Sequence, residues 1–227
     1  MPIVISGAIY VSTMDVVKTE IKRANESTLL QMEQAIDGML RGIERISVEI
    51  SLNKPIADFT HATSPLSDSD HYELFEIANA LRVYKLANEF IEQIYVRYEN
   101  SDTVISPQER MDSRSLFSLL QHREDVKSEE WNDIFDSRYT RAYTPVLYEA
   151  DGKPVRSVLY ARSIALHNPG QPSDVILIVI KDSKLLENIR PAEGSSVVVM
   201  DENNRIIASS DDHSFASSLD YGRMKEE

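Results

Sequence analysis

The segment from Asp15 to Asn53 constrains the fold most, because it contains no Pro and carries a repeating apolar pattern. Only Gly38 and Gly42 interrupt residues with good helix propensity. Apolar residues recur at alternating spacings of three and four, which is the pattern of a helix with one apolar seam. The seam consists of Leu29, Met32, Ile36, Met39, Ile43, Ile46 and Ile50. We therefore predict one helix of about 35 residues, ~50 Å long, that ends before Pro55.

The apolar seam of this helix has two interpretations, which the sequence leaves open. It can pack on the rest of the domain, or it can pair with a second copy of the chain in a homodimeric coiled coil. Both hold if different parts of the seam meet different partners. The opposite face is polar and faces water in either case; it carries Glu33, Gln34, Asp37, Arg41, Glu44 and Glu49.

The first residues form a run of low polarity, "MPIVISGAIYV". No Lys or Arg precedes its apolar part, so it lacks the basic region of a secretory signal. A transmembrane helix needs about 20 apolar residues, and Ile3–Val11 supplies roughly half of that. One interpretation is a buried N-terminal strand. The other, which the long helix after it favours, is that residues 1–14 are the last part of a transmembrane helix.

The remainder of the chain changes from helical to strand-like periodicity. Residues 55–72 are polar and predict a loop, and the helix after it has Ser69 or Asp70 as its cap. In "IEQIYVRY" alternate residues face opposite sides, with Ile94, Val96 and Tyr98 on one side and Gln93, Tyr95 and Arg97 on the other. The predicted helices are 72–90, 113–121 and 181–189; the predicted strands are 91–98, 103–106, 141–148, 155–166 and 174–180; a hairpin follows at 195–212. The order predicts an α+β fold: a long N-terminal helix with an antiparallel sheet module.

Composition excludes several functions. The net charge of −13 disfavours nucleic-acid binding by these residues. The chain has no Cys, so it has no disulfide and no thiolate metal site. It contains none of the nucleophile-elbow, P-loop, zinc-protease or dinucleotide-binding motifs, and its five His residues do not stand at metal-ligand spacing. We predict a protein that is not an enzyme and that needs neither a cofactor nor a metal ion.

Four segments together resemble a known family. "IEQIYVRYENSDTVIS", "VRSVLYARSIAL", "DVILIVIKDSKLLENI" and "SSVVVMDENNRIIASSDD" are similar to the extracellular double-Cache sensor regions of membrane-anchored AraC-type transcription regulators of the Paenibacillus kind. Some sensor histidine kinases carry similar regions. The resemblance implies a stalk helix at 15–54, a membrane-distal, PAS-like Cache module at 55–192 and the start of a membrane-proximal module at 193–227. It also implies a cell-membrane protein with its sensor part outside the cell, whose DNA-binding part is absent from this sequence.

The resemblance implies a small-molecule site between the sheet and the polar crossover after the first hairpin. Aromatic walls with an Arg fork suit a sugar or an organic acid. The candidate residues are Trp131 and Tyr139 of the crossover, Arg141, Tyr143, Tyr160 and Arg162 of the strands, and Asp182. Each has a structural alternative: the Trp as a core anchor, and Asp182 as the cap of the helix after it.

Glu129 and Asn132 depart from the motif of the amino-acid-binding relatives, which have an Arg two residues before the Trp and a Tyr directly after it. An amino-acid ligand is therefore not expected. The function predicted is small-molecule sensing for a transmembrane transcription regulator. A histidine-kinase sensor and a ligand-free PAS-like interaction module are the alternatives.

Overall fold

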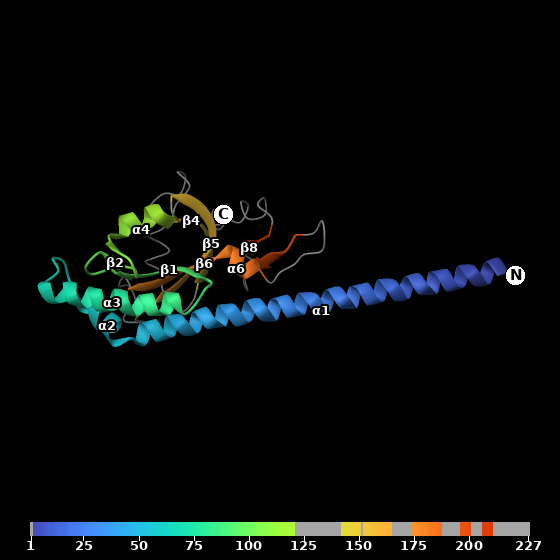
Figure 1. Ribbon diagram of the computed structural model, residues 1–227, viewed down its shortest axis with the longest axis horizontal. Helices are drawn as coiled ribbons and strands as arrows, with labels where there is room; N and C mark the ends of the chain where they lie inside the picture. Colours follow the sequence, from blue (N-terminus) through green and yellow to red (C-terminus); the bar gives the residue numbers. More distant parts are fainter. Residues whose placement is uncertain are drawn as a thin grey trace, which may run out of the picture. The chain divides into compact units, whose positions relative to one another are not determined.

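The computed structural model describes residues 2–120, 142–150, 152–164, 174–187, 196–200 and 206–210 of the chain. The chain divides into two compact units, residues 1–41 and residues 42–227. The helix α1 runs through the first unit and into the second. Figure 1 shows the order of the elements along the chain.

A single helix, α1 (Pro2–Leu52), spans 51 residues without a break. This confirms the continuous helix predicted from the apolar seam. The alternative of an N-terminal strand is wrong, because residues 2–14 are helical. None of the helices in the described part of the chain contains an apolar stretch that could cross a membrane.

The end of α1 differs in detail from the prediction. Asn53, rather than Lys54, takes the extended conformation (φ −67°, ψ 119°) and begins a second helix, α2 (Lys54–Asp58). Pro55 lies in the first turn of α2, where its missing N–H leaves no helical bond unmade. A 3₁₀ turn, η1 (Phe59–His61), follows.

The prediction of a loop from residue 55 is wrong at its start, because α2 and η1 occupy residues 54–61. Ile56 and Phe59 are fully buried, so this segment belongs to the core. Burial of two large apolar side chains explains why a polar-looking stretch folds back onto the domain.

The helix α3 (Asp68–Leu86) begins one turn earlier than predicted. Its cap is Ser67, not Ser69 or Asp70. The Ser67 hydroxyl accepts from the Asp70 N–H (3.3 Å), and the Asp70 carboxylate accepts from the Ser67 N–H (2.6 Å). This reciprocal capping box satisfies two backbone donors that would otherwise lack partners. The buried stripe of α3 consists of Leu74, Ile77 and Leu81.

Six antiparallel strands form the main sheet, in the order β3-β2-β1-β6-β5-β4. They are β1 (Ile91–Tyr98), β2 (Thr103–Ile105), β3 (Arg110–Met111), β4 (Ala142–Ala150), β5 (Lys153–Ser163) and β6 (Val175–Lys181). The short β3 was not predicted, because two residues in a polar stretch carry no periodicity. The chain also forms α4 (Ser113–Leu120), α6 (Asp182–Leu186) and a second sheet of β7 (Val198–Met200) and β8 (Ile206–Ser209). The predicted α+β class with an antiparallel sheet is confirmed.

The central strand of the sheet is β6, which pairs with β1 and β5. It is apolar along its length and buried from Val175 to Ile180, as expected for a strand covered on both faces. Two of the hairpin turns contain a residue with positive φ. Asp102 closes the β1–β2 turn at positive φ (46°), and Gly152 lies in the β4–β5 turn at φ 72°, where L side chains are strained.

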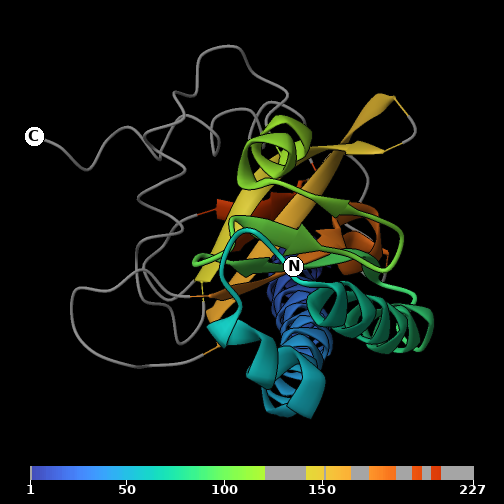
Figure 2. The same ribbon diagram turned by 90° about the vertical axis from the view of Figure 1, so that its left-hand side faces the viewer.

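Helices cover the two faces of the sheet differently. The end of α1 and α3 lie on one side, and α4 lies on the other (Figures 1 and 2). Ile43, Ile46 and Ile50 of α1 are buried. In this part of α1 the seam therefore packs on the domain, which confirms the first interpretation for these residues.

Candidate ligand-binding face

The face of the sheet on the α4 side carries a continuous apolar cluster. Its buried members come from β1, β2, α4, β4, β5 and β6: Tyr95, Val104, Leu116, Leu120, Val146, Tyr148, Leu159, Ala161, Val175, Leu177 and Val179. We call this the α4-side face. The crossover predicted to hold the ligand leaves the end of α4 and returns to β4, and its residues lie outside the described part of the chain.

Two tyrosines bring their hydroxyl groups together on the α4-side face. The hydroxyls of Tyr95 in β1 and Tyr148 in β4 lie 2.9 Å apart. Burial raises the pKa of Tyr95, and the hydrogen bond to Tyr148 raises it further. Burial also raises the pKa of Tyr148. Both side chains are therefore uncharged at neutral pH, and one hydroxyl donates to the other.

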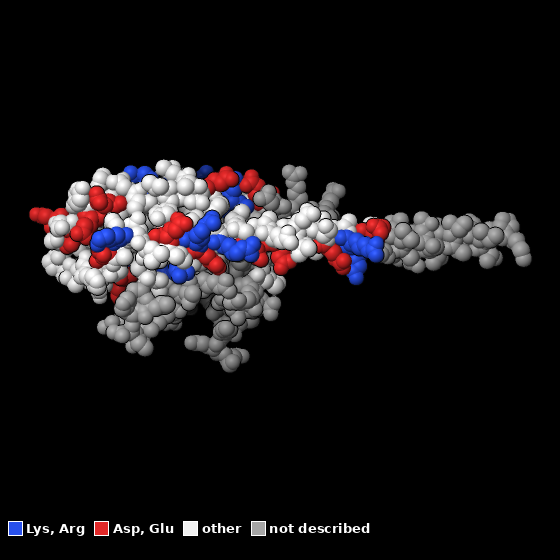
Figure 3. Space-filling model, turned by 90° about the horizontal axis from the view of Figure 1, so that it is seen from below, with Lys and Arg blue, Asp and Glu red and all other residues white. Residues whose placement is uncertain are grey.

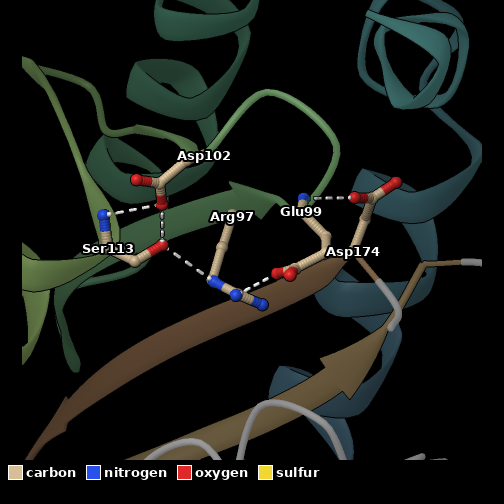
Figure 4. Close-up of polar contacts among 5 residues, drawn as sticks. All are labelled: Arg97, Glu99, Asp102, Ser113 and Asp174. Carbon is tan, nitrogen blue, oxygen red and sulfur yellow. Dashed lines mark hydrogen bonds and ion pairs between the residues drawn. The ribbon is translucent and has the colours of Figure 1, made fainter. Parts of the chain in front are cut away.

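A buried cation lies on the same face of β1. The Arg97 side chain is 8% exposed and forms an ion pair with Glu99. Its Nε donates to Ser113 Oγ (3.0 Å), and Ser113 Oγ donates to Asp102 Oδ1 (2.5 Å). Figure 4 shows the guanidinium between these two groups, Ser113 from the start of α4 on one side and Glu99 on the other. The chain of bonds ties α4 to the β1–β2 hairpin.

Asp174 extends these polar contacts to the edge of β6. Its Oδ1 accepts from the Glu99 N–H (2.8 Å), and its backbone carbonyl accepts from the Ile164 N–H (2.8 Å). Burial raises the pKa of Asp174, although the Glu99 N–H and the Arg97 charge act in the opposite direction. Asp174 therefore connects the residues that follow β1 and β5 to the start of β6, and Figure 4 shows its contact with Glu99.

Three of the predicted ligand residues, Trp131, Tyr139 and Arg141, lie outside the described residues. Their role stays a prediction.

The structure places Tyr143 and Tyr160 together, as neighbours across β4 and β5. Their ring centroids are 5.1 Å apart. Tyr160 is fully buried and its hydroxyl lies 2.9 Å from Ser47 Oγ of α1. The Tyr143 hydroxyl donates to Glu44 Oε1 (3.3 Å). Both rings therefore lie on the face that packs on α1, and their observed contacts anchor that helix. Their role as ligand contacts stays a prediction.

Arg162 occupies β5 opposite Ile176 and is partly buried. Because side chains alternate along a strand, it shares the face of Tyr160. Asp182 is 4% exposed and forms an ion pair with Arg156 (Nη2 to Oδ2, 2.7 Å). The alternative that Asp182 caps α6 is wrong by one residue: Lys181 is at the cap position and Asp182 begins the helix. The structure brings none of the described candidates onto the α4-side face.

Sequence reasoning missed the residues of the α4-side face. It placed Tyr95 and Arg97 correctly on one side of β1, but gave them no role. The alternation in β1 already separated Tyr95 and Arg97 from Tyr98. In the structure, Tyr98 donates to the Ile56 carbonyl (3.1 Å) and packs on Phe59. Since the side of Tyr98 meets α2 and η1, Tyr95 and Arg97 must meet α4.

Metal binding has no support in this region. Among the described ranges, no group of three or more His, Asp or Glu side chains is placed to hold a metal ion. Lys and Arg alternate with Asp and Glu over the described surface seen in Figure 3. On this face the described residues form no continuous basic surface, and the net charge of −13 disfavours binding to a phosphate backbone.

Comparison with known proteins identifies the fold through structure alone. No protein-family model matches the chain, and no curated protein matches it. The sensor domain of the V. cholerae histidine kinase DctB matches with a TM-score of 0.55 at 15% identity, over 83% of this chain and 66% of that chain. The chain has the fold of a Cache-type sensor domain.

Two further structures share this sensor fold. The extracellular domain of the putative histidine kinase vpHK1S-Z8 matches with a TM-score of 0.54 at 12% identity, over 87% of this chain and 72% of that one. The ligand-binding domain of the Campylobacter jejuni chemoreceptor Tlp3, in complex with 4-methylisoleucine, matches with a TM-score of 0.51 at 13% identity, over 82% and 68%. The chain spans about two thirds of the DctB sensor domain's length.

Proposed function

We propose that this chain is the extracellular small-molecule sensing part of a bacterial transmembrane signalling protein. The observation that carries the proposal is that the two faces of the main sheet differ in what covers them. One face is anchored to a continuous 51-residue helix. The other has a buried apolar floor with a tyrosine pair. A rigid helix behind a binding floor can carry a small displacement to a distant output domain.

The ligand class favoured is a sugar or an organic acid rather than an amino acid. Glu129 and Asn132 stand where the amino-acid-binding relatives have Arg and Tyr. The resemblance matches Asp182 to a position that holds the ligand amine in those relatives, and here Asp182 pairs with Arg156. A ligand ammonium would share this buried carboxylate with a guanidinium of like charge, which opposes its binding.

A thermal-shift screen tests the proposal. Sugars, organic acids and amino acids are added to the 227-residue chain, each up to 10 mM, and unfolding temperatures are compared. A ligand at 100 times its Kd stabilises the folded state by about 2.7 kcal/mol, enough for a clear shift. A screen in which amino acids alone raise the unfolding temperature would overturn the ligand class. A screen in which nothing does would favour the ligand-free interaction module.

Variants then separate the two candidate sets of ligand contacts. If the crossover and the α4-side face hold the ligand, Trp131→Ala and Tyr95→Phe reduce the ligand-dependent shift while the unliganded protein still unfolds cooperatively. If the strand residues do, Arg162→Ala has that effect. Tyr72→Phe is the matched control, because Tyr72 is 66% exposed on α3.

For the output we propose an AraC-type transcription regulator, with a histidine kinase as the alternative. Two of the matched structures are sensor regions of histidine kinases, one of them a putative kinase, which supports the alternative. The coding sequence downstream of Glu227 separates them, since a helix-turn-helix pair and a kinase core have unmistakable sequences.

Membrane anchoring and dimer formation are also proposals, and both concern α1. Leu29 is 57% exposed, so this part of the seam is accessible to a second copy. Cysteine pairs introduced at Leu29 and Met32 in membranes from expressing cells would crosslink if the helices meet there. Accessibility of the domain to protease added outside intact cells tests the extracellular location.

A further inference from the structure

The two sheets of the second unit meet at Arg156. This residue lies in β5 of the main sheet, and its Nη2 is 2.7 Å from Asp182 Oδ2 at the start of α6. The same nitrogen donates to the backbone carbonyl of Ser209, the last residue of β8. One guanidinium therefore contacts the main sheet, the short helix that leaves it, and the second sheet.

The groups in these contacts are largely removed from water. The Asp182 side chain is 5% exposed and that of Arg156 is 25% exposed, while Ser209 is fully buried. A carboxylate this deeply buried needs a countercharge. Arg156 meets the need, and the two N–H groups of its Nη2 provide one donor for Asp182 and one for the Ser209 carbonyl.

The register of β5 and β6 explains why Arg156 lies at this junction. Ser157 of β5 pairs with Lys181 of β6, so Arg156 lies one step beyond the last pair, where β6 turns into α6. There β8 lies against α6, β4 and β5. The β7–β8 hairpin is thus packed on the end of the main sheet, with the Arg156 side chain at the junction.

The junction is connected to the α4-side face through β6. Val175, Leu177 and Val179 of β6 belong to the apolar cluster of that face. The strand then runs without a loop through Lys181 into Asp182. A displacement of β6 along its axis would move the Asp182 carboxylate, and through Arg156 the end of β8.

We propose that Arg156 is a positioning residue that couples the β7–β8 hairpin to the β6–α6 end of the main sheet, so that the two sheets move together. A role of this coupling in signalling rests on the proposed sensing function. The coupling itself is a property of the unliganded protein and is testable without any ligand.

The test is hydrogen–deuterium exchange of the full 227-residue chain without ligand. In Arg156→Gln we expect amide exchange in Val198–Met200 and Ile206–Ser209 to rise about tenfold, since local opening of the hairpin becomes easier. Exchange in β1 and β6 should stay within about twofold of the wild type. Arg156→Lys keeps a positive charge but on a shorter side chain, and should give an intermediate increase.

Unchanged exchange in β7 and β8 would overturn the proposal. So would an equal rise in β1 and β6, because Arg156 would then support the whole fold rather than the junction. If Arg156→Gln does not fold, Arg156→Lys decides by the same two readings. Arg114→Gln is the control, since Arg114 is exposed on α4. A ligand screen that fails would remove the sensing function and leave this exchange result standing.

Discussion

Ser47 of α1 and Tyr160 of β5 share a hydrogen bond of 2.9 Å across 113 residues of sequence. Both side chains are fully buried. The Ser47 hydroxyl also donates to the Glu44 carbonyl at 2.7 Å, within its own helix. A ridge of Ile43, Ile46 and Ile50 surrounds this polar contact. The bond therefore specifies how the helix is seated on the sheet, in an otherwise apolar interface.

Removing either partner of this bond should destabilise the second unit. Tyr160→Phe is expected to lower the free energy of unfolding by about 1 kcal/mol, because Ser47 keeps its bond to Glu44. Ser47→Ala should cost roughly 1–3 kcal/mol, because the Tyr160 hydroxyl loses its partner in a buried position. Urea unfolding of both variants and of the double variant measures the coupling. Costs that simply add would contradict a direct bond.

The Tyr95–Tyr148 pair predicts an unusual titration. The pKa of Tyr95 is raised by burial and by Tyr148, so this phenol stays protonated where an ordinary tyrosine ionises. In a spectrophotometric titration between about pH 9 and 11, Tyr95→Phe should therefore leave the tyrosinate amplitude of the folded protein unchanged. In 6 M guanidinium chloride, the same variant should lose one tyrosine's share. A loss of amplitude in the folded state would show that Tyr95 is accessible to solvent.

Asp174 predicts a pH dependence of stability. Burial raises its pKa above the unfolded value of about 3.9. The folded state therefore binds the proton more tightly, and the stability that this group contributes is complete below about pH 3.9 and is lost as pH rises through the folded pKa. The charges that act on it are Arg97, Glu99 and His61.

Asp174→Asn removes this titration and keeps an acceptor for the Glu99 N–H. The variant should thus gain stability relative to the wild type as pH rises from about 3 to 7, as measured by urea unfolding at each pH. Asp112→Asn is the control of opposite sign, because hydrogen bonds from Ser115 lower the pKa of Asp112. If the stability difference from the wild type changed with pH in the same way for both variants, the Asp174 carboxylate would not be buried.

The cap of α3 gives a test of helix boundaries. Ser67→Ala should lower the free energy of unfolding by about 1 kcal/mol, because the Asp70 N–H loses its side-chain acceptor. Ser69→Ala is the matched control, since Ser69 is exposed in the first turn and should change stability by less than about 0.5 kcal/mol. A larger loss from Ser69→Ala would place the cap where the sequence alone had predicted it.

Periodicity in the sequence was sufficient for the elements themselves. The seam of α1, the alternation in β1 and the apolar run of β6 each express a local rule, and each predicted its element. Elements without periodicity were missed or misplaced. The two-residue β3 shows this, as does the α2 segment, whose Ile56 and Phe59 reveal their burial only when the sheet is present.

What the sequence by itself determined was which residues share a side of each strand and, to within a few residues, where the long helix ends, because these follow from backbone geometry. Only the tertiary structure decided which side meets which helix. Alternation along β5 puts Tyr160 and Arg162 on one side, and the structure shows that this side packs on α1. Asp182 was correctly placed after β6, yet its partner is Arg156, one strand away. Contacts between distant segments depend on the packing of whole layers, and no local pattern encodes them.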